Sequence, residues 1–167
     1  MIEHSSSSYS SANQPYAIDR YNEKNGAPKR AVVVLLHGVD GLGTLSGVEI
    51  QKFAEQIAGA GFLVMVPHYF DASDGADTQP VAELFERRLP RLAGYPPRIA
   101  AAVEYALKSS RPLLDALDKS VVIHDHCFYD DANPGSRDHP FLPGGKADLD
   151  SRSRSVAWLK THLMPAS

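Results

Sequence analysis

The fold is decided by residues 31–43, which read AVVVLLHGVDGLG. The first six are apolar without polar alternation, which is typical of a strand buried on both faces of a parallel sheet. The glycine-rich residues after them predict a loop. A helix should follow, because apolar side chains recur at helical spacing: Ile50, Phe53, Ala54, Ile57 and Ala58. Residues 62–66, FLVMV, then form a second buried strand, so the sequence predicts a βαβ unit in a parallel α/β sheet.

The rest of the chain continues this pattern at wider spacing. Ser46 and Glu49 are spaced as a capping box at the start of the first helix. Another helix should follow Pro97, with an apolar stripe at Ile99, Ala102, Val103, Ala106 and Leu107. We expect a third strand to begin at residues 121–124 and a closing helix over residues 149–163. Residues 1–14 are polar and serine-rich, so we expect a disordered N-terminal segment before a single domain over residues 15–167.

Composition limits the classes of function. The chain has 167 residues, with 17 Lys and Arg against 20 Asp and Glu, a formal net charge of −3. This balance gives no electrostatic reason to expect nucleic acid or a membrane surface as partner. The single cysteine cannot form an internal disulfide, and no apolar run approaches the length of a membrane span. We therefore expect a soluble, cytoplasmic protein with no cofactor.

Three segments together resemble the dienelactone hydrolase family of the α/β-hydrolase fold. They are residues 32–43, residues 53–70, and a tail made of residues 128–133 and 155–160. The resemblance implies a mostly parallel sheet flanked by helices, and hydrolysis of a small carboxylic ester or lactone through an acyl-enzyme. It also implies that the loop after the first strand is an oxyanion and substrate loop, formed by His37, Gly38, Val39, Asp40 and Gly41.

Within that loop, the resemblance implies that the backbone N–H of Val39 faces the developing alkoxide. The plainer alternative is a turn after a buried strand. His68, Tyr69 and Phe70 follow the second strand, where open α/β sheets bind ligands, so they are candidates to line a substrate pocket. Aromatic side chains that simply cover the end of the sheet are the alternative. Asp71, Asp74 and Asp77 make an acidic loop that we expect to be solvated.

The resemblance has a gap where the nucleophile belongs. The family carries Cys or Ser in Gly-x-Cys/Ser-x-Gly at a sharp strand-to-helix turn, and the pattern is absent from this sequence. The nearest match is GTLSG at residues 43–47, one position out of register. The segment that bears the catalytic acid is missing as well. We interpret this as an internal deletion with its seam near residues 111–113, and the alternative is a small α/β domain that never had those parts.

No nucleophile is identified, and the general base is ambiguous. His139 resembles the family histidine if the loop before it is longer than usual. The ungapped comparison puts Pro134 at that position, and proline cannot transfer a proton. Cys127 lies inside an expected strand with no turn to expose it, which favours an inert core residue.

The sequence leaves open whether the chain is an enzyme. By resemblance it is a dienelactone-hydrolase-like hydrolase that lacks its nucleophile and acid and is therefore inactive. One alternative is a non-catalytic remnant that binds a ligand or associates with itself through exposed sheet edges. Another is a metal-assisted hydrolase using His124 and His126, which alternate on one strand face; solvent-facing histidines at an edge strand are the simpler interpretation, and no metal site is assigned.

Overall fold

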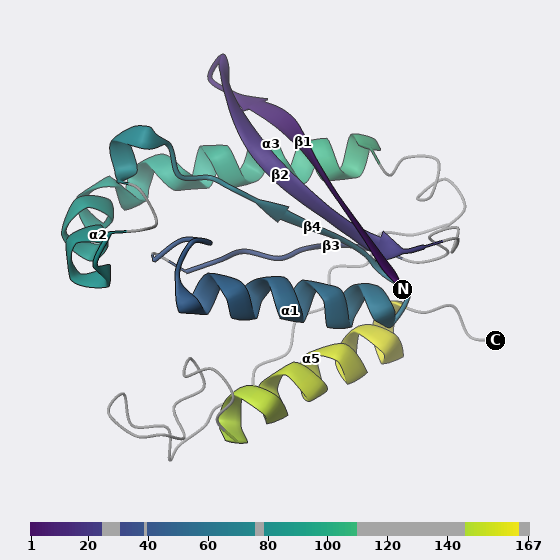
Figure 1. Ribbon diagram of the computed structural model, residues 1–167. Coiled ribbons are helices and arrows are strands. Elements are labelled where there is room, and N and C mark those ends of the chain that lie inside the picture. Colours follow the sequence, from purple (N-terminus) through teal and green to yellow (C-terminus); the bar gives the residue numbers. More distant parts are fainter. Residues whose placement is uncertain (25–30, 39, 76–78, 110–145, 164–167) are drawn as a thin grey trace. The chain divides into compact units, whose positions relative to one another are not determined.

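The computed structural model describes residues 1–24, 31–38, 40–75, 79–109 and 146–163. The chain divides into two compact units, Met1–Asp118 and Lys119–Ser167, and each is described by itself. The described part of the first unit holds a four-stranded sheet with helices (Figure 1), and that of the second holds one helix. The expected seam at residues 111–113 and the expected strand at residues 121–124 lie outside the described residues.

The chain begins with an antiparallel hairpin. Strand β1 (Ile2–Ser11) pairs along its whole length with β2 (Gln14–Glu23). The turn consists of Ala12 and Asn13, both with positive φ (48° and 63°), the backbone that matches the twist of a tight hairpin. The expected disorder of residues 1–14 is corrected here: each residue of β1 is paired in register with a residue of β2, and the buried Tyr9 anchors the strand in the core.

The expected βαβ unit is present. Strand β3 (Val32–Val34) pairs in parallel with β4 (Leu63–Pro67), and α1 (Leu45–Gly59) connects them. All five residues of β4 are buried, as its apolar sequence predicted. The N-cap of α1 is Thr44, whose Oγ1 accepts the N–H of Gly47 at 3.2 Å. The expected Ser46–Glu49 capping box is therefore wrong by two residues.

The strand order is β1-β2-β4-β3, and β2 pairs antiparallel with β4. Only the β3–β4 pair is parallel, so the expectation of a mostly parallel sheet is wrong for the described residues. The error has a physical cause. A serine-rich strand carries little of the apolar alternation by which strands are recognised, and its two-residue turn lacks the usual glycine.

Helical segments follow β4, and the last of them in the first unit packs on the sheet. A short 3-10 turn, η1 (Ala72–Asp74), precedes α2 (Val81–Arg88), a second 3-10 segment, η2 (Leu89–Gly94), and α3 (Tyr95–Ser109). Helix α3 covers one face of the sheet and α1 contacts β2 and β4 on the other (Figure 1). The buried face of α3 is narrower than the predicted apolar stripe, because Ala102 and Ala106 are buried whereas Val103 and Leu107 are exposed.

The core between α3 and the sheet includes tyrosine side chains from the strands. Its buried members come from all three of the longer strands and from α3: Tyr9, Tyr16, Ile18, Leu63, Met65, Ala102 and Ala106. Alanines at the helix positions allow α3 to approach closely over the tyrosines. The core therefore depends on the hairpin as much as on the βαβ unit.

The described part of the second unit is α5 (Lys146–Leu163), which confirms a closing helix that begins slightly earlier than expected. Arg154 and Asp150 form an ion pair of 2.8 Å one turn apart on its surface. Among the residues described, no helix is both long and apolar enough to cross a membrane.

Candidate functional site

Short-range hydrogen bonds connect the described residues of the loop after β3. The N–H of Gly41 donates to the carbonyl of Gly38 at 3.1 Å, and Gly41 has a φ of 82°, which glycine adopts without strain. Thr44 donates its hydroxyl to Asp40 Oδ2 at 2.9 Å, while its oxygen caps α1. The candidate oxyanion loop is thereby joined to the start of α1. Val39, whose N–H was the expected oxyanion donor, lies outside the described residues.

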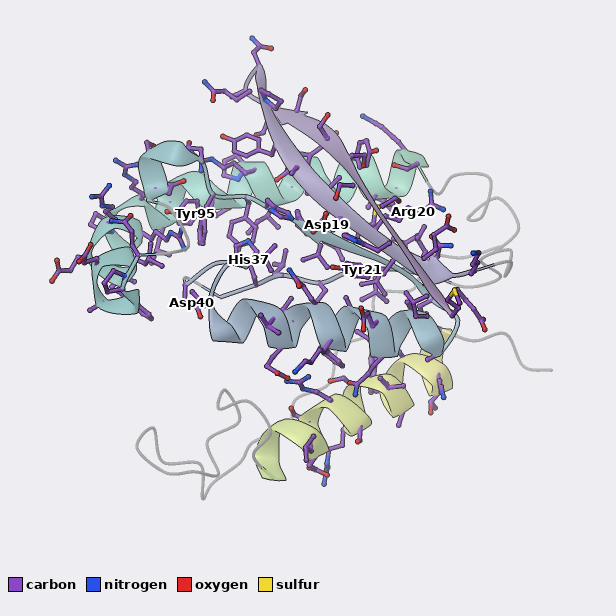
Figure 2. The ribbon with its side chains drawn as sticks, viewed as in Figure 1. Asp19, Arg20, Tyr21, His37, Asp40 and Tyr95 are labelled. Carbon is purple, nitrogen blue, oxygen red and sulfur yellow. The ribbon has the colours of Figure 1, made fainter. Side chains whose placement is uncertain are left out.

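His37 begins this loop and is buried, with 6% of its surface exposed. Its ring is stacked on Tyr69, with centroids 4.1 Å apart and planes 2° from parallel, and Phe70 meets it edge-on at 4.9 Å. Nδ1 lies 2.9 Å from the carbonyl oxygen of Gly38. Figure 2 shows His37 at the end of β3, near Asp40. The ring of His37 is thus part of the packed interior.

Tyr69 connects the two loops that the sequence analysis singled out. Its hydroxyl donates to the backbone carbonyl of His37, and its own carbonyl accepts from Arg98 Nη1 at 3.0 Å. Burial raises the pKa of Tyr69 to about 12, so the hydroxyl stays protonated and able to donate near neutral pH. The segment after β4 therefore holds the first carbonyl of the loop after β3.

His68 is directed to a different partner. Its Nε2 atom lies 2.8 Å from Oδ2 of Asp19. Asp19 is a buried carboxylate on β2 (Figure 2). Ser6 donates to Oδ1 of the same carboxylate, and Nε2 of His4, stacked on Tyr21, lies 3.4 Å from it. Burial would raise the pKa of Asp19, but the hydrogen bonds from His68 and Ser6 lower it to about 2. The charged carboxylate joins β1, β2 and the end of β4.

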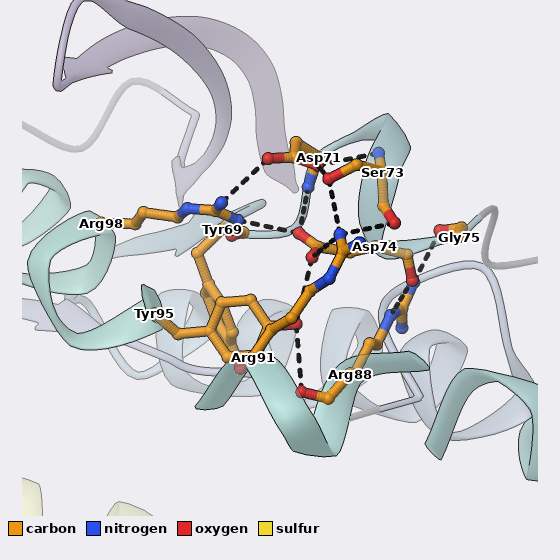
Figure 3. A network of polar contacts seen from close by, with 9 residues as sticks. All are labelled: Tyr69, Asp71, Ser73, Asp74, Gly75, Arg88, Arg91, Tyr95 and Arg98. Atoms are coloured by element: carbon orange, nitrogen blue, oxygen red, sulfur yellow. Dashed lines mark hydrogen bonds and ion pairs between the residues drawn. The ribbon is translucent and has the colours of Figure 1, made fainter. Parts of the chain in front are cut away.

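Asp74 organises the segment that follows. The carboxylate is fully buried and accepts Arg98 Nη1 at 2.8 Å, Arg91 Nη1 at 3.2 Å and the N–H of Asp71 at 2.8 Å (Figure 3). Burial would raise the pKa of Asp74, but these donors hold it below its ordinary value. The expectation of a solvated acidic loop is therefore wrong at Asp74, because two guanidinium groups replace water around it.

Arg88 closes the same network from α2. Its fully buried guanidinium donates from Nε to the carbonyl of Asp74 at 3.0 Å and from Nη2 to that of Gly75 at 2.9 Å. Its Cζ lies 4.0 Å above the centroid of Phe70, a cation–π contact. Backbone carbonyls and a ring face thus help to compensate for the lost hydration of this cation.

The structure brings two of the predicted groups together. The loop of His37 lies against Tyr69 and Phe70 through direct ring contacts, whereas His68 is directed to Asp19. Candidates in the tail fall outside the described residues: His124, His126, Cys127, Pro134 and His139. Within the described ranges, no group of three or more His, Cys, Asp or Glu side chains could hold a metal ion.

Sequence reasoning missed the polar residues that hold this region. Asp19 stands in a strand between Ile18 and Arg20, where only its alternation with Tyr21 on one strand face indicated burial. Asp74 and its arginine partners are 14 to 24 residues apart in sequence, a separation at which no local pattern exists. A signal was available for Arg98 alone, since a basic residue in the first turn of a helix is unfavourable without a special partner.

Comparisons with known proteins support the fold. No family model and no curated protein matches the sequence. The structure is similar to that of a candidate dienelactone hydrolase from Klebsiella pneumoniae subsp. pneumoniae MGH 78578, with a TM-score of 0.54, 15% identity, and coverage of 65% of this chain and 45% of that one. It is also similar to a structure named m3DLH, with a TM-score of 0.51, 16% identity, and coverage of 64% and 43%.

At these identities the likeness establishes a dienelactone-hydrolase-like fold and nothing finer. The chain matches less than half of the length of either solved structure.

Proposed function

We propose that this chain is a dienelactone-hydrolase-like domain that retains the oxyanion loop but does not hydrolyse carboxylic esters or lactones. The fold likeness and the two connected loops support the lineage. The observation that carries the proposal is that the chain keeps this loop in a packed form while its sequence contains no Gly-x-Ser/Cys-x-Gly. Oxyanion donors without a nucleophile leave only a small residual acceleration.

The retained loop is held from two sides. Tyr69 donates to the carbonyl of His37, and Thr44 connects Asp40 to the helix that follows. Oxyanion stabilisation requires backbone donors that are fixed before the reaction begins. The hydrogen bonds and the buried His37–Tyr69 stack provide such fixation. The loop is therefore well suited to present backbone N–H groups to a carbonyl oxygen.

The nearest match to a nucleophile motif does not have the required setting. Residues 43–47 include the N-cap and first turn of α1, and a loop rather than a strand precedes them. A Cβ on Gly47 would lie 2.2 Å from the carbonyl oxygen of Leu42, so this glycine serves close packing of the loop on the helix. A nucleophile elbow instead places its residue on a strained strand-to-helix turn.

The proposal is tested by covalent labelling and by turnover. The folded chain is treated with a fluorophosphonate and its intact mass is measured, with heat-denatured chain and an active serine esterase as controls. Hydrolysis of p-nitrophenyl acetate and of a simple lactone is followed in parallel. We expect no adduct and, at most, the residual acceleration of a site without a nucleophile, far below the rate of the esterase control.

Two results would overturn the proposal. A stoichiometric adduct on folded chain alone would reveal an unforeseen nucleophile, which peptide mapping would identify among Ser46, Ser109, Ser110 and Cys127. Turnover that resists the fluorophosphonate but disappears with a chelator would instead favour metal-assisted hydrolysis through His124 and His126.

A further inference from the structure

The outer edge of β1 is the longest unpaired strand edge among the described residues. In the described part of the chain, β1 is the first strand of the sheet and pairs through its backbone only with β2. The N–H of Lys24 donates to the carbonyl of Met1 at 2.9 Å, so odd-numbered residues of β1 bond toward β2. The N–H and C=O groups of the even-numbered residues therefore point away from the sheet: Ile2, His4, Ser6, Ser8 and Ser10.

This edge lacks the devices that normally prevent strand pairing. Its register with β2 is continuous over ten residues, so it contains no bulge. The strand has no proline, lysine or arginine, and Glu3 is its only acidic side chain and His4 its only basic one. Exposed edges are usually protected by such residues or by distortion. The outer edge of β3, by comparison, belongs to a strand of only three residues.

We propose that the outer edge of β1 pairs with β1 of a second copy of this chain, giving one continuous sheet through a symmetric dimer. The proposal goes beyond the proposed function and is independent of it. Seven of the ten side chains of β1 are exposed, five of them serines, so the edge offers no apolar pocket that would select a flexible foreign peptide. A second β1 is already extended on its own β2, so little conformational entropy is lost on pairing.

The charges of the strand are compatible with this partner. Antiparallel pairing about a twofold axis at Ser6 places His4 opposite Ser8 of the second copy and Glu3 opposite its Tyr9. No like charges face one another in this register, which would otherwise destabilise the pair. Even-numbered residues meet even-numbered ones, so the outward backbone groups of both copies bond together. The edge is thus complementary to itself.

The first test measures the molar mass of the chain in solution and the exchange rates of its β1 amides. Sedimentation equilibrium over a concentration series should show a monomer that converts to a dimer. Hydrogen exchange should then show that the amides of His4, Ser6, Ser8 and Ser10 become protected as the concentration rises. The odd-numbered amides of β1 provide the internal control, since β2 protects them in monomer and dimer alike.

The second test removes one outward donor without breaking the hairpin. Ser8→Pro deletes an N–H that points away from β2, and edge strands tolerate proline at such positions. We expect this variant to keep the fold by circular dichroism and to weaken dimerisation by about tenfold or more, because both copies carry the substitution and two backbone hydrogen bonds related by the twofold axis are lost. Ser8→Thr retains the N–H and should dimerise like the parent chain.

Three results would overturn the proposal. They are a monomer at every concentration, a dimer whose even-numbered β1 amides exchange freely, and a dimer that Ser8→Pro leaves unchanged. The last result would mean that the dimer interface lies in another part of the chain, such as the edge of β3. None of these measurements depends on hydrolytic activity, so the failure of this proposal and of the proposed function are distinguishable.

Discussion

Replacement of Asp19 by asparagine should destabilise the fold by an amount that depends on pH. The carboxylate is 9% exposed and contacts His68 and His4 at 2.8 and 3.4 Å. Its pKa falls from an ordinary 3.8 to about 2. A shift of this size corresponds to about 2 kcal/mol of stabilisation by the charged form. Asp19→Asn keeps the shape of the side chain but removes its charge.

The lowered pKa of Asp19 determines how its contribution to stability depends on pH. Because the pKa is lower in the folded chain, the contribution of Asp19 is complete above about pH 4 and is lost as the pH falls through about 2. Urea unfolding of both chains, followed by circular dichroism from pH 7 to pH 2, measures the difference in unfolding free energy. We expect a gap of about 2 kcal/mol at pH 7 that closes across this acid range.

Glu104→Gln is the matched control in the same unit, since Glu104 is 69% exposed and pairs with Lys108 at 3.4 Å. Its loss should change stability by only a few tenths of a kcal/mol. The reasoning is refuted if the gap for Asp19→Asn is constant down to pH 2, or if it is no larger at pH 7 than that of the control. Either result would mean that the charge of Asp19 contributes nothing to the joining of the three strands.

Further substitutions test the packing around the loop and the hairpin. Gly47→Ala should lower the unfolding free energy by several kcal/mol, because the new Cβ would lie 2.2 Å from a backbone oxygen. The new Cβ of Gly59→Ala would meet only a side-chain carbon, at 3.8 Å, so this variant should be more stable by about 0.5 kcal/mol in the same urea titration. Ala12→Gly should raise the melting temperature, since the residue has a φ of 48°, which costs alanine about 1 kcal/mol; an unchanged or lower value would contradict a left-handed turn. Tyr69→Phe should cost about 1 kcal/mol through loss of a buried hydrogen bond and should speed amide exchange in the loop after β3, a change that a purely apolar role of the ring would not produce.

The βαβ unit could be predicted because its signals are local. Residues 31–36 and 62–66 are continuous apolar runs, and the intervening helix repeats its apolar positions at the period of an α-helix. Each of these patterns reports directly on which side chains must leave water. The sequence places the helix start two residues late, because Thr44 and Ser46 carry equivalent capping hydroxyls, and the hydrogen bond from Thr44 to Asp40 in the loop is not visible in the capping pattern.

The hairpin could not be predicted in the same way. The serines of β1 contribute almost no burial, so the strand exists through backbone pairing with β2 and through Tyr9. Neither contribution appears in a hydrophobic pattern. Composition favours disorder when a polar segment has no partner, and here the partner is the next strand. The antiparallel character of the sheet followed from this missed element.

The sequence singled out two residues that prove to be neighbours, while their roles in an oxyanion loop and a pocket stay predictions. His37 and Tyr69 were selected separately, and the structure brings their rings together. What holds them could not be read from the sequence, because Arg98 reaches Asp74 and the carbonyl of Tyr69 across long separations along the chain. Buried ion networks arise from the meeting of distant segments, and single-sequence patterns describe only neighbours.

The junction between β2 and β4 has a consequence for how quickly the chain reaches its native state. The hairpin and the βαβ unit are each formed by neighbouring segments, but they meet in the sheet through only four residue pairs, from Ile18 with Pro67 to Tyr21 with Val64. Forming this junction closes the longest loop in the sheet. The chain loses the entropy of loop closure before the contacts across the junction stabilise it. Substitutions along the junction should therefore slow refolding, whereas those in the hairpin turn should mainly accelerate unfolding.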